Sequence, residues 1–135
     1  MRVQKAKKSD YPRIIALART LGLDYSGMES DDFWAASEGR EVFGICGLKE
    51  HPDCRELLSL GVHSGRRGRG LGLRLVSALL ADTSGDIYLT TVIPAFFEKS
   101  GFEKTLRIPL SIIKTGEWCE GCDKTLCTVM VRRAE

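Results

Sequence analysis

One short segment combines glycine and arginine in a pattern suited to binding a phosphate group. It consists of Arg67, Gly68, Arg69, Gly70, Leu71 and Gly72. Because glycine has no Cβ, the backbone amides of such a loop can turn toward an anion, and arginine adds charge that complements a pyrophosphate. The same residues also fit a plain glycine-rich turn with solvated arginines, so the pattern alone leaves both interpretations open.

The spacing of this loop differs from two common nucleotide-binding motifs. It has no Gly-Lys-Ser/Thr ending and no Gly-x-Gly-x-x-Gly spacing. The sequence therefore disfavours a mononucleotide- or dinucleotide-binding fold.

A second group of reactive side chains lies near the C-terminus. Cys119 and Cys122 have the Cys-x-x-Cys spacing of zinc sites and redox pairs, and Cys127 follows them. A zinc site needs four ligands, so the fourth would have to come from Cys54, His51, His63 or water. We expect reduced thiols rather than a bound metal, and the alternatives left open are a zinc ion and a redox pair or disulfide.

The glycine loop lies between a predicted strand and a predicted helix. Residues 57–62 are almost all apolar, as in a central strand covered on both faces, and apolar residues recur at helical spacing from 71 to 82. Residues 86–91 form the next strand, which predicts a strand–helix–strand unit with parallel strands. The loop would then stand at a helix N-terminus, where the helix dipole favours an anion.

The rest of the chain predicts further strands and helices around this unit. The expected elements are a strand over 2–6, a helix over about 9–22, a loop or broken helix over 23–32, strands over 33–37 and 42–48, a short helix over 94–99, and a hairpin of strands over 107–114 and 125–131. Together they predict an α+β fold with a mixed sheet and helices on both faces.

Length and composition predict one folded domain over residues 1–135. The chain is 43% hydrophobic and 28% charged, which is close to the globular average. Its net charge of +2 is too small to indicate a nucleic-acid partner. The sequence has no apolar run of about 18 residues and no signal-peptide core, so we expect a cytoplasmic protein without a membrane partner.

Two blocks of sequence in a fixed order carry a family resemblance. Residues 67–72 match the pattern Gln/Arg-x-x-Gly-x-Gly/Ala in full, and residues 95–102 are similar to the pattern Ala-x-x-Tyr/Phe-x-x-x-Gly-Phe. Both patterns belong to the GNAT superfamily of acetyl-CoA-dependent N-acetyltransferases, whose second and third strands resemble residues 33–36 and 42–47. The resemblance implies the GNAT fold, a twisted mixed sheet of about six or seven strands, splayed between strands four and five and flanked by about four helices.

The resemblance also implies how acetyl-CoA would bind. The pantetheine arm would pair with the main chain of the fourth strand, at Leu60, Gly61 and Val62. The amides of residues 67–72 would hold the pyrophosphate. Two aromatic residues, Phe96 and Phe97, would flank the thiol end.

Glu56 is the candidate general base for acetyl transfer. It precedes the phosphate loop by the same distance as the base glutamate of the histone-acetyltransferase members, although an exposed glutamate at a strand end is the alternative. The amide of Val62 or its neighbour would bind the oxyanion. Phe97 stands where many members carry a tyrosine that acts as the general acid. The general acid is therefore unassigned, and the candidates are Tyr25, Tyr88, Ser100, Cys119 and Cys122.

The acceptor is the least determined part of this prediction. In the family, loops equivalent to residues 22–31 and 115–124 wall the acceptor pocket. Residues 89–91 and 95–102 look particularly like the acetyltransferase domain of N-acetylglutamate synthases. That likeness favours direct transfer to the amine of a small molecule, an amino acid such as glutamate, whose carboxylates could meet Arg107, Lys99 or Arg55.

Two rival functions remain open. A protein or peptide N-terminus could be the acceptor, and the phenylalanine at position 97 makes a non-catalytic acetyl-CoA-binding regulatory module conceivable. Dimers are common in the family, so a monomer or a homodimer is expected.

Overall fold

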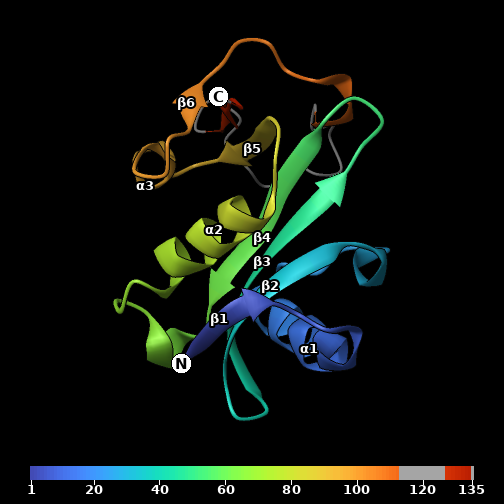
Figure 1. The fold of residues 1–135 in the computed structure, drawn as a ribbon, viewed down its shortest axis with the longest axis vertical. Helices are drawn as coiled ribbons and strands as arrows, with labels where there is room; N and C mark the ends of the chain where they lie inside the picture. The colour runs from blue at the N-terminus through green and yellow to red at the C-terminus, as the bar shows by residue number, and fades with distance from the viewer. Residues whose placement is uncertain (113–126, 135) are drawn as a thin grey trace. The chain divides into compact units, whose positions relative to one another are not determined.

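Seven strands form a mixed sheet in the order β1-β2-β3-β4-β5-β7-β6 (Figure 1). The computed structural model describes residues 1–112 and 127–134. Strand β4 runs parallel to β5, whereas β1–β2, β2–β3, β5–β7 and β6–β7 are antiparallel pairs. The strand bounds are Arg2–Lys5, Asp32–Glu38, Glu41–Glu50, Arg55–Val62, Ile87–Thr91, Glu103–Lys104 and Thr128–Arg132 for β1 to β7. The expected α+β class with a mixed sheet is confirmed.

The described residues divide into two compact units. The first comprises Met1–Lys49 and Leu57–Ser84, and the second comprises Glu50–Glu56 and Gly85–Glu135. Strand β4 contributes residues to both units.

Helix α1 of the first unit spans Tyr11–Leu21 and begins and ends as its sequence predicts. Pro12 occupies the first turn, where its missing N–H costs nothing, and Gly22 ends the helix with a left-handed φ of 70°. The apolar face of the helix packs into a buried cluster. Its members are Tyr11, Ile14, Leu17, Ala18, Met28, Phe33, Ala35 and Ile45.

Strand β2 lies between α1 and α2, because its side chains alternate between two faces. Phe33 and Ala35 pack with α1, whereas the indole of Trp34 on the other face donates a 2.7 Å hydrogen bond to Asp82 of α2. Helix α2 spans Leu71–Asp82, as its periodicity predicts. The two helices therefore cover opposite faces of β2 (Figure 1).

The second unit is built on β5, β7 and β6. Leu89 of β5 pairs with Met130 of β7, and both side chains are buried. Helix α3 spans Pro94–Glu98, within the range expected for a short helix. The described residues thus contain the three α-helices α1 to α3, and the short 3₁₀ turns Lys8–Asp10, Met28–Ser30, Ser64–Arg66 and Leu110–Ile112 accompany them.

Two sequence-based expectations need correction. The strand expected over 107–114 is absent from its described part, where Ile112 N–H donates to Pro109 C=O at 3.1 Å in a 3₁₀ turn. Proline lacks the N–H that a ladder needs, so β6 forms earlier, at Glu103–Lys104. Strand β4 is central in the sheet but is not covered on both faces, since residues 58–62 remain partly exposed.

Candidate functional site

Glu56 lies near the start of β4 and is buried, with only 5% of its surface exposed. It is therefore not the exposed strand-end glutamate that was the alternative. In the parallel pair β4–β5 it stands opposite Tyr88, so the two side chains share a face of the sheet. Glu56 Oε1 lies 2.8 Å from His51 Nε2, a polar contact of the kind that a buried carboxylate requires.

Ser59 gives β4 a local irregularity three residues further on. Its φ is 52°, and it is the only non-glycine residue with a positive φ in the described chain. A side chain in this left-handed region costs about 1 kcal/mol or more, so surrounding contacts must hold it. Ser59 Oγ supplies one such contact, a 2.9 Å hydrogen bond to Leu23 C=O.

Gly61 is closely packed against the end of α1 and the residues that follow it. A Cβ at this position would lie 2.5 Å from Leu23 Cδ1 and 2.8 Å from Leu21 Cδ1. The segment that leaves α1 thus passes directly over β4. Sequence reasoning missed this packing role, because the residues that impose it are far away in the chain.

Near the end of β4, the main-chain N–H and C=O groups of successive residues point to opposite sides of the strand. His63 N–H donates to Phe43 C=O of β3 at 2.7 Å, so the polar groups of the preceding residue, Val62, point away from β3. Val62 C=O accepts a 3.1 Å hydrogen bond from Arg67 Nε. Of the residues expected to pair with pantetheine, Val62 has its N–H directed away from the neighbouring strand.

The glycine loop adopts a conformation that favours glycine. Gly68 and Gly70 have φ values of 80° and 74°, and a Cβ at either position would meet no atom within 4 Å. The loop needs glycine for its backbone angles rather than for space. Arg74 N–H makes a 3.1 Å bond to Gly70 C=O, so the amides of residues 71–73 precede the hydrogen-bond ladder of α2.

The arginines of this region have different surroundings. Arg66 pairs with Glu38 at 3.1 Å and its guanidinium lies 4.1 Å from the centre of the Phe43 ring. Arg67 holds the Val62 carbonyl, whereas Arg69 is exposed. Protein groups thus engage two of the three guanidinium groups, which leaves Arg69 and the first-turn amides of α2 as sources of positive potential for a ligand.

Phe97 belongs to the core of the second unit. It is 5% exposed, and its ring packs edge-on against Phe96 and Phe102 at centroid distances of 5.0 and 5.8 Å. Phe96 is partly exposed. The flanking role of Phe96 and Phe97 at a thiol remains a prediction.

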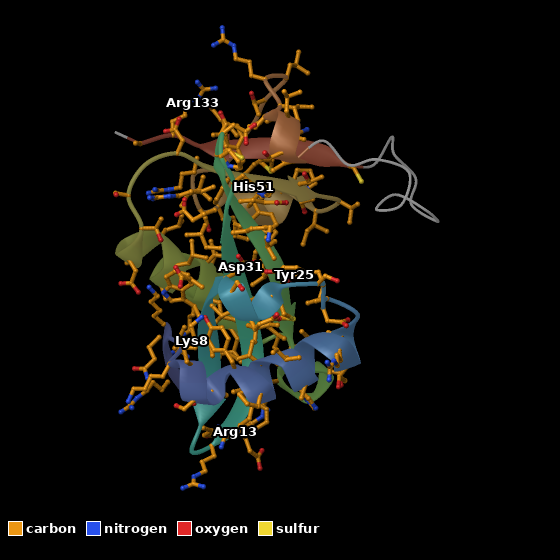
Figure 2. The ribbon with its side chains drawn as sticks, turned by 90° about the vertical axis from the view of Figure 1, so that its right-hand side faces the viewer. Lys8, Arg13, Tyr25, Asp31, His51 and Arg133 are labelled. Carbon is orange, nitrogen blue, oxygen red and sulfur yellow. The ribbon has the colours of Figure 1, made fainter. Side chains whose placement is uncertain are left out.

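The hydroxyl candidates for the general acid differ in their contacts. Tyr25 donates a 2.6 Å hydrogen bond to Asp31 Oδ2, and the two residues lie side by side in Figure 2. Ser100 Oγ is buried and has no hydrogen-bond partner among the described residues. Tyr88 is the neighbour of Glu56 across β4 and β5, whereas Cys119 and Cys122 lie outside the described residues.

The loop after α1 is tied to the first unit by polar contacts. Asp31 accepts from Tyr25 and pairs with Lys49 at 3.3 Å, while its own carbonyl accepts a 2.6 Å bond from Tyr11. Met28 buries its side chain beneath the loop. The other expected acceptor loop, 115–124, lies outside the described residues.

The cysteines give no metal site within residues 1–112 and 127–134, where no group of three or more potential ligands comes together. Cys46 and Cys54 are thiols. Burial raises the pKa of Cys46 far above its usual range and raises that of Cys54 to about 11. The proposed cluster around Cys119 and Cys122 is outside the described chain.

The mixed sheet, with helices on both faces of β2, defines the chain as an α+β protein. A family model described as the acetyltransferase (GNAT) domain matches residues 29–104, which is more than half of the chain. The chain belongs to the GNAT acetyltransferase family.

Solved structures of low sequence identity share this fold. Rv2747 of Mycobacterium tuberculosis, solved with CoA, is 20% identical with a TM-score of 0.72, and 100% of each chain is covered. N-acetylglutamate synthase of Neisseria gonorrhoeae is also 20% identical, with a TM-score of 0.74 over 100% of this chain but only 36% of the synthase. Aminoglycoside 6'-acetyltransferase type Ii is 19% identical, with a TM-score of 0.64 over 98% and 97% of the two chains.

Two further observations complete the comparison. No curated protein sequence matches this chain significantly. In the described part of the chain, no helix has the length and apolar character needed to cross a membrane.

Proposed function

We propose that this protein is an acetyl-CoA-dependent N-acetyltransferase that acts on the amine of a small molecule, an amino acid such as glutamate. The observation that carries the proposal is Glu56. It is the only ionisable side chain among the buried polar residues of the described chain, and it lies on the strand that leads into the glycine loop. A buried carboxylate at this place is suited to remove a proton from an amine.

The chain's residues fit acetyl-CoA. The amides of residues 71–73, at the start of α2, and the open backbone at Gly68 and Gly70 suit a pyrophosphate, and Arg69 adds charge. For pantetheine we assign the main chain of residues 60–62. Val62 would contribute its N–H, because its carbonyl already accepts from Arg67.

The proposed reaction is direct attack by a neutral amine on the acetyl group. Acetyl-CoA supplies the activated thioester. Glu56 accepts the proton that the amine loses, and the backbone amide of a neighbour of Val62 stabilises the oxyanion that forms on the acetyl carbonyl. The C–S bond then breaks, and the thiolate takes a proton from solvent or from one of the hydroxyl candidates.

The amino-acid acceptor is supported by the sequence likeness to N-acetylglutamate synthases and by the similarity to the Neisseria enzyme's structure. That enzyme is much longer than this chain, and an aminoglycoside enzyme shares the fold as well. Arg55 pairs with Glu50 at 2.8 Å, whereas Lys99 and Arg107 are exposed. We therefore propose Lys99 and Arg107 before Arg55 as partners of an acceptor carboxylate.

Release of coenzyme A in the presence of acetyl-CoA and a panel of acceptors tests this function. We expect turnover with glutamate or a related amino acid, and weaker turnover with polyamines and short peptides. In Glu56→Gln, kcat should fall by about 100-fold or more, as for loss of a general base, with the Kd of acetyl-CoA within about twofold.

Glu103→Gln is the matched control, because Glu103 is an exposed acid in the same unit that pairs with Arg133, and the substitution should leave kcat unchanged. Turnover confined to peptides would replace the amino-acid proposal with the peptide alternative. Cofactor binding without turnover on any amine would indicate the regulatory module instead.

A further inference from the structure

The buried carboxylate of Glu56 contacts His51, a partner that residue spacing alone does not predict. His51 Nε2 lies 2.8 Å from Glu56 Oε1, and the two side chains are 13% and 6% exposed. Among the charged pairs of the described residues, no other has both side chains so deeply buried. Removing two such groups from water costs free energy that a pair of apolar side chains would not require.

His51, labelled in Figure 2, lies in a turn that hydrogen bonds hold at two points. His51 N–H donates to Cys54 C=O at 2.8 Å, which closes the turn between β3 and β4. Asp53 in the same turn accepts a 3.2 Å hydrogen bond from Ser111 N–H. A short turn fixed at two points gives His51 little freedom to leave Glu56.

We propose that His51 is a positioning residue for Glu56, which rests on the proposed role of Glu56 as the base. Its Nε2–H donates to Oε1 and holds the carboxylate in one rotamer, oriented to accept the proton of the acceptor amine. His51 itself touches neither acetyl-CoA nor the acceptor. If His51 only stabilised the β3–β4 turn, its loss would affect folding rather than kcat.

Three substitutions at position 51 separate these roles. Glutamine can place an N–H near the position of Nε2, asparagine places one only near the position of Nδ1, and leucine has none. We expect His51→Asn and His51→Leu to lower kcat by about 10- to 100-fold, a part of the loss expected for the base itself. His51→Gln should recover most of kcat, and the KM of acetyl-CoA should stay within about twofold in all three.

A double-mutant cycle shows whether His51 acts through Glu56. His51→Leu should cost little further activity in a Glu56→Gln protein, because the group that it positions is already gone. Equal and multiplicative losses in both backgrounds would overturn the proposal. So would similar kcat values for the folded leucine, asparagine and glutamine variants, which would indicate a structural clamp.

A spectroscopic readout does not depend on turnover. The chain has two histidines, so ¹⁵N-labelled histidine gives two imidazole patterns, and Gly65 N–H donates to Nδ1 of His63. Glu56→Gln should shift the His51 ring signals and leave those of His63 in place. An unchanged His51 pattern would overturn the contact itself, while a wild-type protein that acetylates no amine would overturn the proposed function and with it the kinetic role of His51.

Discussion

At the scale of single residues, Cys54 shows how burial and charge control reactivity. Its pKa rises from 9.0 to about 11, first because burial removes water from the thiolate and then because the Asp53 carboxylate is close. The thiolate is the reactive form, so this thiol should be slow toward electrophiles at neutral pH.

Alkylation measured residue by residue tests this expectation. At pH 8, iodoacetamide should modify Cys54 about 100-fold more slowly in the folded protein than in the denatured chain, and the folded rate should rise up to about pH 11.

The unfolded thiol ionises near pH 9.0 and the folded one near 11, so stability should fall as the pH rises between these values. Cys54→Ser should reduce that fall, and equal alkylation rates at pH 8 would contradict the shift.

The sequence predicts the candidate site residues but not all of their surroundings. The family resemblance points to Glu56, whereas its contact with His51 requires the turn between β3 and β4. The left-handed backbone of Ser59 gave no sequence signal, because non-glycine residues rarely adopt it. The Ser59 conformation is held by Leu23, a residue far away in the chain, and local residue patterns do not predict such a contact.

At the scale of elements, the hydrogen bond from Trp34 to Asp82 joins β2 to the end of α2. The Trp34 side chain is buried, so its N–H needs this acceptor. Asp82→Leu should lower the free energy of unfolding by about 1–2 kcal/mol, because the indole N–H loses its partner. Urea denaturation measures the change.

Asp82→Asn is the matched control for this contact. Its amide oxygen can still accept from the indole, so it should retain most of the stability. The leucine variant should also alter the emission of Trp34. Equal stability of the leucine and asparagine variants would mean that the hydrogen bond contributes little.

The elements themselves were mostly predictable. The helices α1 and α2 follow from apolar periodicity with a glycine or proline at an end, and the β2–β3 hairpin follows from two apolar runs around a short turn. In the described part of 107–114 a 3₁₀ turn forms in place of the expected strand, and Pro109 stands inside that apolar run. Proline inside an apolar run is itself a signal against a paired strand.

At the scale of the whole molecule, β4 is shared by both compact units. Arg55 and Glu56 belong to one unit and residues 57–62 to the other. We propose that residues 1–135 fold as one domain, since a strand cannot keep half of its hydrogen bonds independently of the rest.

This proposal predicts a single thermal transition. The chain has two tryptophans, and in a Trp118→Phe background the emission of Trp34 reports on the first unit, while hydrogen exchange of the amides of β5 and β7 reports on the second. Both probes should give the same unfolding midpoint and the same free energy of opening. Separate midpoints would indicate two domains.

The contact of Gly61 with Leu21 and Leu23 has an evolutionary consequence. A side chain at position 61 would force the ends of both leucine side chains to shift, so such a substitution should cost less stability where one of them is shorter. The effects of mutations at the three positions should therefore depend on one another. Relatives that carry a larger residue at position 61 should tend to have a smaller side chain at the end of α1.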